Sequence, residues 1–356
     1  MTIPPQLPQQ RGQATPNRQC DYMAIINPVN IIAEVGSVHD GSFGNAHKLI
    51  DLAASCGADA VKFQTHIAAA ETLRNAPMPP YFKGEPRFDY FERTGFSLAQ
   101  WKALKAHCDD VGIQFVSSPF STEAVELLEE VGVDSFKIAS GEVTNLPMLE
   151  IIGQKRKQVL LSSGMSNWAE LDAAVNALRR HHADVVVMQC TSMYPTPNQR
   201  VGLNVLGEMA ARWALPVGYS DHTLDNHAAF AAVALGAIVV EKHLTFSRSM
   251  YGSDAANAAE PAQFRDLVAG IRAISTMRGA PVDKDDLQSL HDMKRIFEKS
   301  VVSAVAIPAG TVLKRSMLAI RKPGDGIPAA QIDSLVGRKA SRDIAAEQLL
   351  REGDIA

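Results

Sequence analysis

The sequence is poor in cysteine and aromatic residues, and it has no long apolar run. Its 4 cysteines show no CxxC spacing, which argues against a disulfide framework or a zinc cage and is typical of reduced thiols in a cytoplasmic protein. No window reaches the roughly 18 consecutive apolar residues of a membrane span. Lys+Arg 35 against Asp+Glu 39 leaves a net charge of -4, so neither nucleic acid nor an anionic membrane is expected as the main partner.

The N-terminal stretch also lacks the apolar core of a secretory signal. Residues 1–20 are rich in Pro and Gln instead, and we expect residues 1–22 to form a flexible tail. The whole chain is 46% hydrophobic and 21% charged, which is the composition of a globular enzyme or scaffold. Its 356 residues suffice for two or three domains without disulfides or a structural metal.

A strand followed by a helix recurs eight times along the chain. Several of the helical stretches start at a Ser, Thr or Asn cap and stop at Gly. This alternation predicts parallel strands with crossover helices, and eight units in roughly 250 residues favour a closed (β/α)₈ TIM barrel over an open doubly wound sheet. The expected strands are 30–36, 59–65, 113–119, 134–140, 158–164, 184–190, 216–222 and 237–243.

Two segments depart from the repeat. The stretch 66–96 is rich in Pro and aromatic residues, and we expect it to form part of the barrel's mouth; the alternative is an excursion packed on the barrel's side. We assign 23–280 to the barrel, 281–295 to a linker helix and 296–356 to a small β-rich domain with the turn signals PAG and PGDG. About 60 residues make a marginal free-standing fold, so this domain is expected to dock elsewhere.

Polar side chains gather where the expected strands end. In such barrels the chemistry lies at the carboxyl ends of the strands, and packing alone does not explain polar groups at eight converging ends. The residues are Glu34, Lys62, Gln64, Thr65, Ser117, Ser118, Lys137, Ser140, Ser162, Ser163, Gln189, Thr191, Tyr194, Ser220, Asp221, His222, Glu241, Lys242 and His243.

Lys62 and Lys137 each lie between two apolar neighbours within an expected strand. A buried ammonium group is costly unless it meets an anion. We therefore expect the two lysines to bind a doubly anionic small ligand, for example one with a phosphate and a carboxylate. Two alternatives stay open. Each lysine could pair with a barrel carboxylate such as Glu34 or Glu142, or one could form the Schiff base of an aldolase, because a desolvated amine loses its proton readily.

His222 and His243 end two adjacent expected strands, where both imidazoles can reach one cation. Two histidines without a third fixed thiolate or carboxylate make an open site, with positions for water and substrate. Nitrogen ligands completed by oxygen suit Mn²⁺, Co²⁺ or Fe²⁺, and Mg²⁺ less well. The alternative is one catalytic and one structural histidine. The other eight histidines are expected on the surface.

The motifs at these strand ends resemble one known family, the sialic acid synthases, which condense phosphoenolpyruvate with an N-acylated hexose. The segment GSDAA at 252–256 continues the resemblance. The C-terminal part resembles the antifreeze-like SAF domain of these enzymes, which has a β-clip fold. Only about the first twenty residues lie outside the resemblance. The matching motifs, in chain order, are IIAEVG, GADAVKFQT, FVSSPFS, FKIASGE, LLSSGM, CTSMYPTP, YSDHT and GAIVVEKH.

The resemblance implies roles for the matching residues. His222 and His243 would bind a divalent metal, Mn²⁺ first, with Mg²⁺ or Co²⁺ as alternatives. The catalytic residues would be Glu34, Lys62, Lys137, His222 and His243. The substrates would be bound by Gln64, Ser118, Ser140, Ser163, Thr191, Ser192, Tyr194, Ser220, Asp254, Arg321 and Lys322.

The resemblance also implies an assembly. The small domain would sit over the barrel of a partner subunit in a domain-swapped homodimer, where an arginine in an RPG-like turn completes the sugar site. Four features differ from the family pattern. Residues 38–41 lack the Asn of the family's NHxG segment, and the stretch 66–96 differs from the best-known members. Ser192 stands where the family has Asn, and Lys322 stands where the arginine is expected, one position after Arg321. A lysine does not reproduce the planar two-point contact of an arginine.

The implied reaction joins phosphoenolpyruvate, an N-acylated hexose and water to give a sialic-acid-type nonulosonate and phosphate. N-acetylmannosamine, a diacetylated bacillosamine-type sugar and mannose remain open as acceptors. Three other functions stay in view. They are another phosphoenolpyruvate-dependent 3-deoxy-keto-acid synthase, a metal-dependent pyruvate aldolase, and a non-enzymatic sugar-binding protein.

Overall fold

The computed structural model describes residues 28–77 and 84–356. The expected tail, residues 1–22 with Cys20, lies outside the described residues. The chain divides into two compact units, Met1–Ala280 and Pro281–Ala356, and each is described by itself. No helix in the described ranges is both long enough and apolar enough to cross a membrane.

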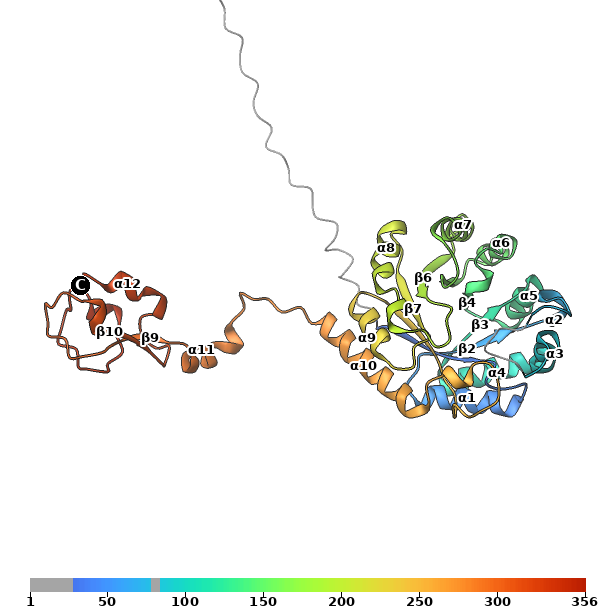
Figure 1. Cartoon of the computed structure of the whole chain (residues 1–356), viewed down its shortest axis with the longest axis horizontal. Coiled ribbons are helices and arrows are strands. Elements are labelled where there is room, and N and C mark those ends of the chain that lie inside the picture. Colours follow the sequence, from blue (N-terminus) through green and yellow to red (C-terminus); the bar gives the residue numbers. More distant parts are fainter. Residues whose placement is uncertain (1–27, 78–83) are drawn as a thin grey trace, which may run out of the picture. The chain divides into compact units, whose positions relative to one another are not determined.

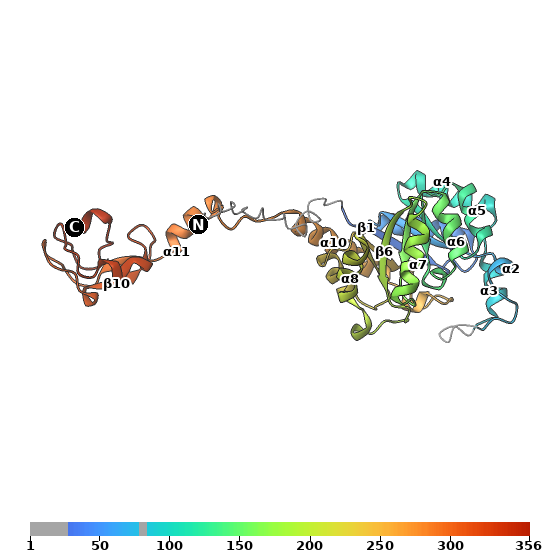
Figure 2. The same ribbon diagram turned by 90° about the horizontal axis from the view of Figure 1, so that it is seen from above.

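The first unit is a closed barrel of eight parallel strands whose order around the barrel follows the sequence. Figures 1 and 2 show its strands surrounded by helices. The last strand closes on the first, with Asn30 opposite Val239 and Glu34 opposite His243. The TIM barrel prediction is therefore confirmed, and the open sheet is excluded. The strands are β1 (Asn30–Gly36), β2 (Ala60–Thr65), β3 (Gln114–Pro119), β4 (Ser135–Ile138), β5 (Gln158–Ser162), β6 (Asp184–Cys190), β7 (Val217–Asp221) and β8 (Val239–His243).

Helices cover the outside of the barrel, and local sequence sets where they begin and end. Ser97 and Asn167 form capping boxes, and Ser121 accepts a hydrogen bond from the helix it precedes. Gly112 and Gly132 end two helices in the left-handed conformation. The covering helices are α1 (Phe43–Ser55), α4 (Leu98–Val111), α5 (Thr122–Val131), α6 (Leu146–Gln154), α7 (Trp168–Arg179), α8 (Leu203–Trp213), α9 (His227–Ala234) and α10 (Pro261–Gly279).

The two faces of the strands fill two separate cores. Side chains that point outward pack against the helices in a large apolar cluster. Side chains that point inward form a smaller cluster, which plugs the barrel below its mouth. The inward cluster consists of Ile32, Ala60, Val116, Leu160, Val186, Met188 and Val239.

The second unit is a small β-rich domain with its own core, as expected. Its two strands, β9 (Ser300–Ser303) and β10 (Leu318–Arg321), pair antiparallel. Isolated bridges such as Val302 with Leu349 continue the pairing. The helix expected over 281–295 lies later in the chain, because α11 covers His291–Phe297. A short α12 (Ile332–Leu335) completes the unit.

Gly218 offers a test of the inward core. A Cβ at this position of β7 would lie 3.0 Å from the carbonyl oxygen of Val239 and 3.1 Å from the Met188 side chain. We expect Gly218→Ala to lower the free energy of unfolding by about 1–3 kcal/mol, because the site is already filled. Gly207→Ala on α8 is the control. A Cβ there meets nothing within 4 Å, so it should add about 0.4–1 kcal/mol. Chemical denaturation measures both, and equal effects would contradict the packing described.

Candidate active site

The strand ends and the loops after them enclose a cavity of about 430 Å³, a size typical of small-molecule sites. Its charged walls come from strands far apart in the sequence. Glu34 lies on β1, Lys62 on β2, Lys137 on β4 and Glu241 on β8, while Asp254 lies in the loop after β8. The site therefore forms only when the barrel closes.

Strand alternation decides which side chains reach this cavity. Side chains alternate along a strand, so every second residue points into the barrel. Two positions after a residue of the inward apolar cluster, the next inward side chain therefore reaches the cavity. Thus Leu160 is followed by Ser162, Met188 by Cys190, and Val239 by Glu241. The predicted residues that line the cavity are Glu34, Lys62, Gln64, Ser118, Lys137, Ser140, Ser192, Tyr194, Ser220, His222, His243 and Asp254.

Four predicted residues do not line this cavity. The Ser163 hydroxyl donates to the carbonyl of Met188, 3.0 Å away, and the Thr191 hydroxyl donates to the carbonyl of Arg200, 2.7 Å away. Both lie one position out of phase with an inward residue, so their side chains are engaged in the barrel wall and its loops. Arg321 and Lys322 belong to the second unit, Pro281–Ala356.

A chain of buried charges lies on the cavity floor. The Lys62 ammonium is 2.9 Å from a Glu34 oxygen and 3.8 Å from a Glu241 oxygen, and Lys137 is 3.4 Å from the other Glu241 oxygen. All four side chains are at most 6% exposed. The structure therefore shows the alternative in which each lysine pairs with a barrel carboxylate. The partners are Glu34 and Glu241, and Glu142 is not one of them.

The pKa values of Glu34 and Glu241, the two carboxyl groups among these buried charges, shift in opposite directions. Burial raises the pKa of Glu34 and outweighs the effect of Lys62. Burial also acts on Glu241, but Lys137 and Lys62 together lower the pKa of Glu241 to about 2. Carboxyl groups separated in this way suit different roles, one moving a proton and one staying ionised.

The ammonium of Lys62 is held in its charged form. Burial acts to lower its pKa, but Glu241 and Glu34 raise it above the usual value. A Schiff-base lysine needs the neutral amine. The environment of Lys62 therefore argues against the aldolase alternative at this position.

His222 and His243 form a facing pair at the mouth of the same cavity. Their ring centroids are 5.7 Å apart, and the Tyr194 ring lies 4.2 Å from that of His222. Nδ1 of His222 is 2.8 Å from the Thr191 carbonyl, to which it donates, so Nε2 keeps its lone pair. Nδ1 of His243 is buried and has no hydrogen-bond partner within residues 28–77 and 84–356, and burial lowers the pKa of His243 to about 4.

These features fit a divalent cation held by two imidazoles, of which His243 is neutral. Burial acts to lower the pKa of His222, but the Cys190 thiol 3.8 Å from its Nδ1 raises it above the usual value, so a cation there would displace a proton. A backbone carbonyl that fixes the tautomer of a histidine is the usual outer support of a metal ligand. No group of three or more His, Cys, Asp or Glu side chains in the described ranges could hold a metal. Water and substrate would have to complete such a site, as in open metal centres.

The stretch 66–96 reaches the cavity, as predicted for its described part. Arg87, Tyr90 and Phe91 of α3 (Arg87–Thr94) line the wall. His66 stacks between Phe91, 3.8 Å away, and Phe120, 4.1 Å away. The helix is thereby anchored beside the site. Residues 78–83 of the stretch lie outside the described residues.

A hydrogen-bonded series runs from this wall to the floor. His66 bonds to Glu71 at 2.8 Å and to Gln64 at 3.2 Å, and Gln64 donates to Glu34 at 2.8 Å. The expectation that the eight other histidines lie on the surface is thus wrong for His66. It is also wrong for His39, which is only 3% exposed. Both follow strand ends, where loops fold inward over the barrel.

Asp254 closes the cavity on the side of β1. One of its oxygens accepts hydrogen bonds from the Ser37 amide at 2.9 Å and the Ser37 hydroxyl at 3.0 Å. Gly36 permits this approach. It has a φ of +54°, and a Cβ on it would lie 2.3 Å from the Asp254 carboxylate.

The residues predicted to bind or catalyse leave out several lining residues. The sequence places Glu241 and Ser162 at strand ends without a role, and it does not single out Cys190. The period of two, counted upward from the apolar layer, places all three in the cavity. Arg87 and Tyr90 could not be found in this way, because they come from an insertion whose sequence has no periodic pattern.

Comparison with known proteins adds a family. Residues 49–283 match the NeuB family, and residues 298–356 match the SAF domain. The chain is 36% identical to the N,N'-diacetyllegionaminic acid synthase of Campylobacter jejuni, over 90% of this chain and 98% of that protein. It is 33% identical to the human N-acetylneuraminate-9-phosphate synthase, over 92% of each chain.

Solved structures agree with this result. The N-acetylneuraminic acid synthetase of Leptospira borgpetersenii, crystallised with citrate, superposes with a TM-score of 0.67 at 29% identity, over 76% of this chain and 92% of that one. A truncated 3-deoxy-D-arabino-heptulosonate 7-phosphate synthase of Thermotoga maritima has a TM-score of 0.55 at 15% identity, covering 72% of this chain and 89% of that one. The second likeness concerns the fold alone.

Glu241 can be tested as the centre of the charge chain. Glu241→Gln keeps the shape of the side chain but leaves Lys137 without its carboxylate partner. We expect the free energy of unfolding to fall by about 3–5 kcal/mol, because a buried ion pair is broken. Glu130→Gln, which breaks an exposed pair with Lys102, should cost about 0.2–1 kcal/mol. A similar small loss for both, in urea denaturation, would contradict the role given to Glu241.

Proposed function

The chain belongs to the NeuB family, and from that membership we propose that it condenses phosphoenolpyruvate with an N-acylated hexose and water, giving a nonulosonate and phosphate. It is an enzyme of the sialic acid synthase type, which forms a C–C bond. The observation that carries the proposal is the floor of the cavity. Two buried lysines held in place by Glu34 and Glu241 lie beneath a pair of imidazoles.

Lys62 and Lys137 bind the phosphate and carboxylate of phosphoenolpyruvate in this proposal. Hydroxyl groups already surround them. Ser118 is 3.2 Å from Lys62, and Ser162 is 2.5 Å from Lys137. Hydroxyls and ammonium groups buried at the floor of a cavity bind oxyanions strongly and need little reorganisation as charge develops.

Charge balance adds a constraint. Glu34 and Glu241 already offset the two lysines, so the four groups carry no net charge when all are ionised. An anionic substrate then needs further positive charge nearby, or a proton on a carboxylate, because uncompensated charge is costly in a buried site. Glu34 can take that proton, since its pKa is raised by burial.

His222 and His243 hold a divalent metal in this proposal, Mn²⁺ first and Mg²⁺ or Co²⁺ as alternatives. When bound, the metal acts as a Lewis acid toward the aldehyde of the open-chain sugar. Thr191 orients His222 through its carbonyl, and burial keeps His243 neutral. His243 is thus prepared to donate an electron pair, whereas a cation at His222 would have to displace a proton, because, against the effect of burial, the Cys190 thiol raises the pKa of His222.

The remaining residues bind the sugar and move protons. Glu34 gives or takes a proton at its carboxyl group, and Gln64 orients it through a 2.8 Å hydrogen bond. Asp254, fixed by Ser37, accepts hydrogen bonds from sugar hydroxyls. Arg87 faces the same space, and its buried Nε has no hydrogen-bond partner among the described residues. We therefore place the end of the acceptor that is remote from the aldehyde against α3. N-acetylmannosamine, a diacetylated bacillosamine-type sugar and mannose remain the acceptors to compare.

The reaction itself is the first test. Inorganic phosphate should be released from phosphoenolpyruvate only when an N-acylhexosamine is present, and mass spectrometry should detect the nonulosonate. An aldolase would release no phosphate, and a binding protein would form no product.

EDTA should abolish turnover and Mn²⁺ should restore it, while His222→Ala and His243→Ala should stay folded but lose metal. Full activity in excess EDTA would exclude the metal role.

We also propose a homodimer in which the SAF domain of one chain completes the sugar site of another. Its support is an apolar face within the second unit. Met293, Ile296 and Phe297 of α11 are 50–55% exposed there, and Leu290 is 49% exposed. Large apolar side chains gathered on one short helix indicate a surface that another body covers. Arg321 and Lys322 would then reach the partner's sugar.

Subunit mixing tests this arrangement. Glu34→Ala impairs the barrel, and the double change of Arg321 and Lys322 to Ala impairs the turn, so each variant alone should be poorly active. After subunit exchange, random assortment should return up to about a quarter of wild-type activity, because mixed dimers contain one intact site. Exchange shown by differently tagged chains without any recovery of activity would contradict the shared site.

A further inference from the structure

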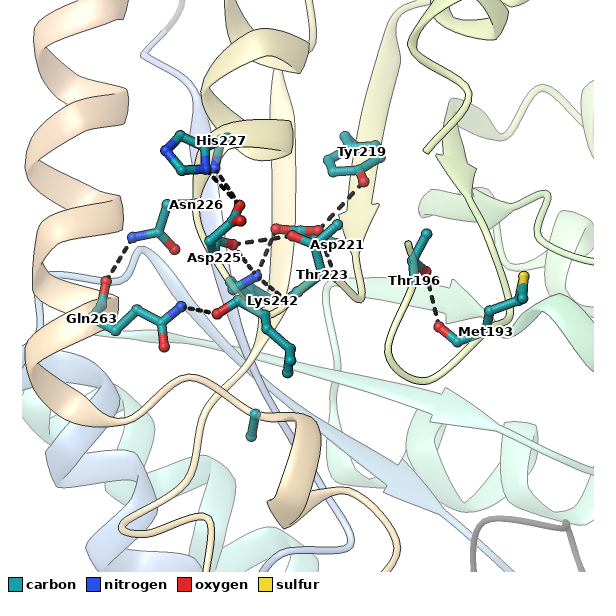
Figure 3. A network of polar contacts seen from close by, with 12 residues as sticks. Met193, Thr196, Tyr219, Asp221, Thr223, Asp225, Asn226, His227, Lys242 and Gln263 are labelled. Carbon is teal, nitrogen blue, oxygen red and sulfur yellow. Dashed lines mark hydrogen bonds and ion pairs between the residues drawn. The ribbon is translucent and has the colours of Figure 1, made fainter. Parts of the chain in front are cut away.

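Lys242 on β8 points away from the cavity that its two neighbours line. The alternation that turns Glu241 and His243 inward turns Lys242 outward, where it is only 2% exposed. A buried ammonium group needs acceptors for its three N–H bonds. Figure 3 shows where they come from.

All three acceptors belong to one short segment that begins with the last residue of β7. The Lys242 Nζ lies 2.6 Å from an Asp221 carboxylate oxygen and 2.8 Å from each of the carbonyls of Thr223 and Asp225 (Figure 3). The second Asp221 oxygen accepts from the Thr223 amide at 2.9 Å. The segment 221–225 is therefore folded around a single cation.

His222 lies inside that segment, between Asp221 and Thr223. Its own carbonyl accepts a hydrogen bond from the Thr196 amide at 2.9 Å, so its backbone is held from two sides. Since Lys242 adjoins His243 in the sequence, one strand carries one imidazole of the pair and fixes the backbone of the other. No comparable link joins Lys242 to the cavity, because it is not among the lining residues.

We propose that Lys242 is a positioning residue that sets the separation of His222 and His243 and thereby the affinity of the site for a divalent cation. This inference rests on the proposed metal role of the two histidines. Partners that orient a metal ligand from outside typically change metal affinity 10–100-fold when they are removed.

The test measures Mn²⁺ binding directly, in the full chain, by isothermal titration calorimetry. The main variant combines Lys242→Met with Asp221→Asn, so that no uncompensated charge is left buried. We expect its Kd for Mn²⁺ to rise about 10–100-fold, with a native circular dichroism spectrum. Asp221→Asn alone keeps the ammonium and both backbone carbonyls, so it should weaken binding less. It decides the matter if the double variant does not fold.

A matched control separates positioning from stability. Arg272 pairs with Asp59 at 2.6 Å and also bonds to the Val29 carbonyl at 2.6 Å, at the opposite end of the barrel strands. Asp59→Asn with Arg272→Met should lower the Tm while leaving the Kd for Mn²⁺ unchanged.

Three outcomes are decisive. An unchanged Kd in a folded Lys242 or Asp221 variant would overturn the inference. An equal loss of affinity in the Asp59 and Arg272 control would overturn it too, since the effect would then follow stability. If the wild-type protein does not bind Mn²⁺, the proposed metal site itself is wrong, which is a separate failure.

Discussion

The buried chain of charges from Glu34 through Lys62 and Glu241 to Lys137 is the constraint on which the site depends. Ions at this depth are stable only when each meets an opposite charge in good geometry. Their partners lie on β1, β2, β4 and β8, so the pairing exists only in a closed barrel. The site therefore cannot form without the closed barrel. In turn, these charges find their partners only when β8 pairs with β1 and closes the barrel.

The same constraint shapes the chemistry. Because the lysines are already paired, their charges serve as a fixed framework rather than as free binding energy. Glu241 stays ionised between two ammonium groups, whereas Glu34, with one such neighbour and a raised pKa, can carry a proton. Two similar carboxyl groups thus acquire different properties from their positions on adjacent strands. The imidazole pair above them and Arg87 on the wall supply further places in the cavity where positive charge can be held.

Much of this arrangement could be predicted from the sequence, for local reasons. The expected strands differ from the observed ones by at most two residues at either end, because β-branched runs, caps and glycines mark the boundaries. The cavity residues were predicted less well where alternation was not applied. Ser163 and Thr191 are one position out of phase, while Ser162 and Cys190 face inward. Arg87 depends on how an irregular insertion folds over the mouth, and no local pattern encodes such a path.

The pairing of β1 with β8 also bears on how the chain is made. Asn30 and Val239 are neighbours in the barrel, but they leave the ribosome on the order of 10–40 s apart at 5–20 residues per second. Glu34 and Lys62 are therefore synthesised early, while Glu241 comes last. Until it arrives, Lys137 lacks the carboxylate with which it pairs and Lys62 lacks its second one, so both ammonium groups keep their water. Dehydration of the cavity floor is thus a late event of biosynthesis, governed by the emergence of a single strand.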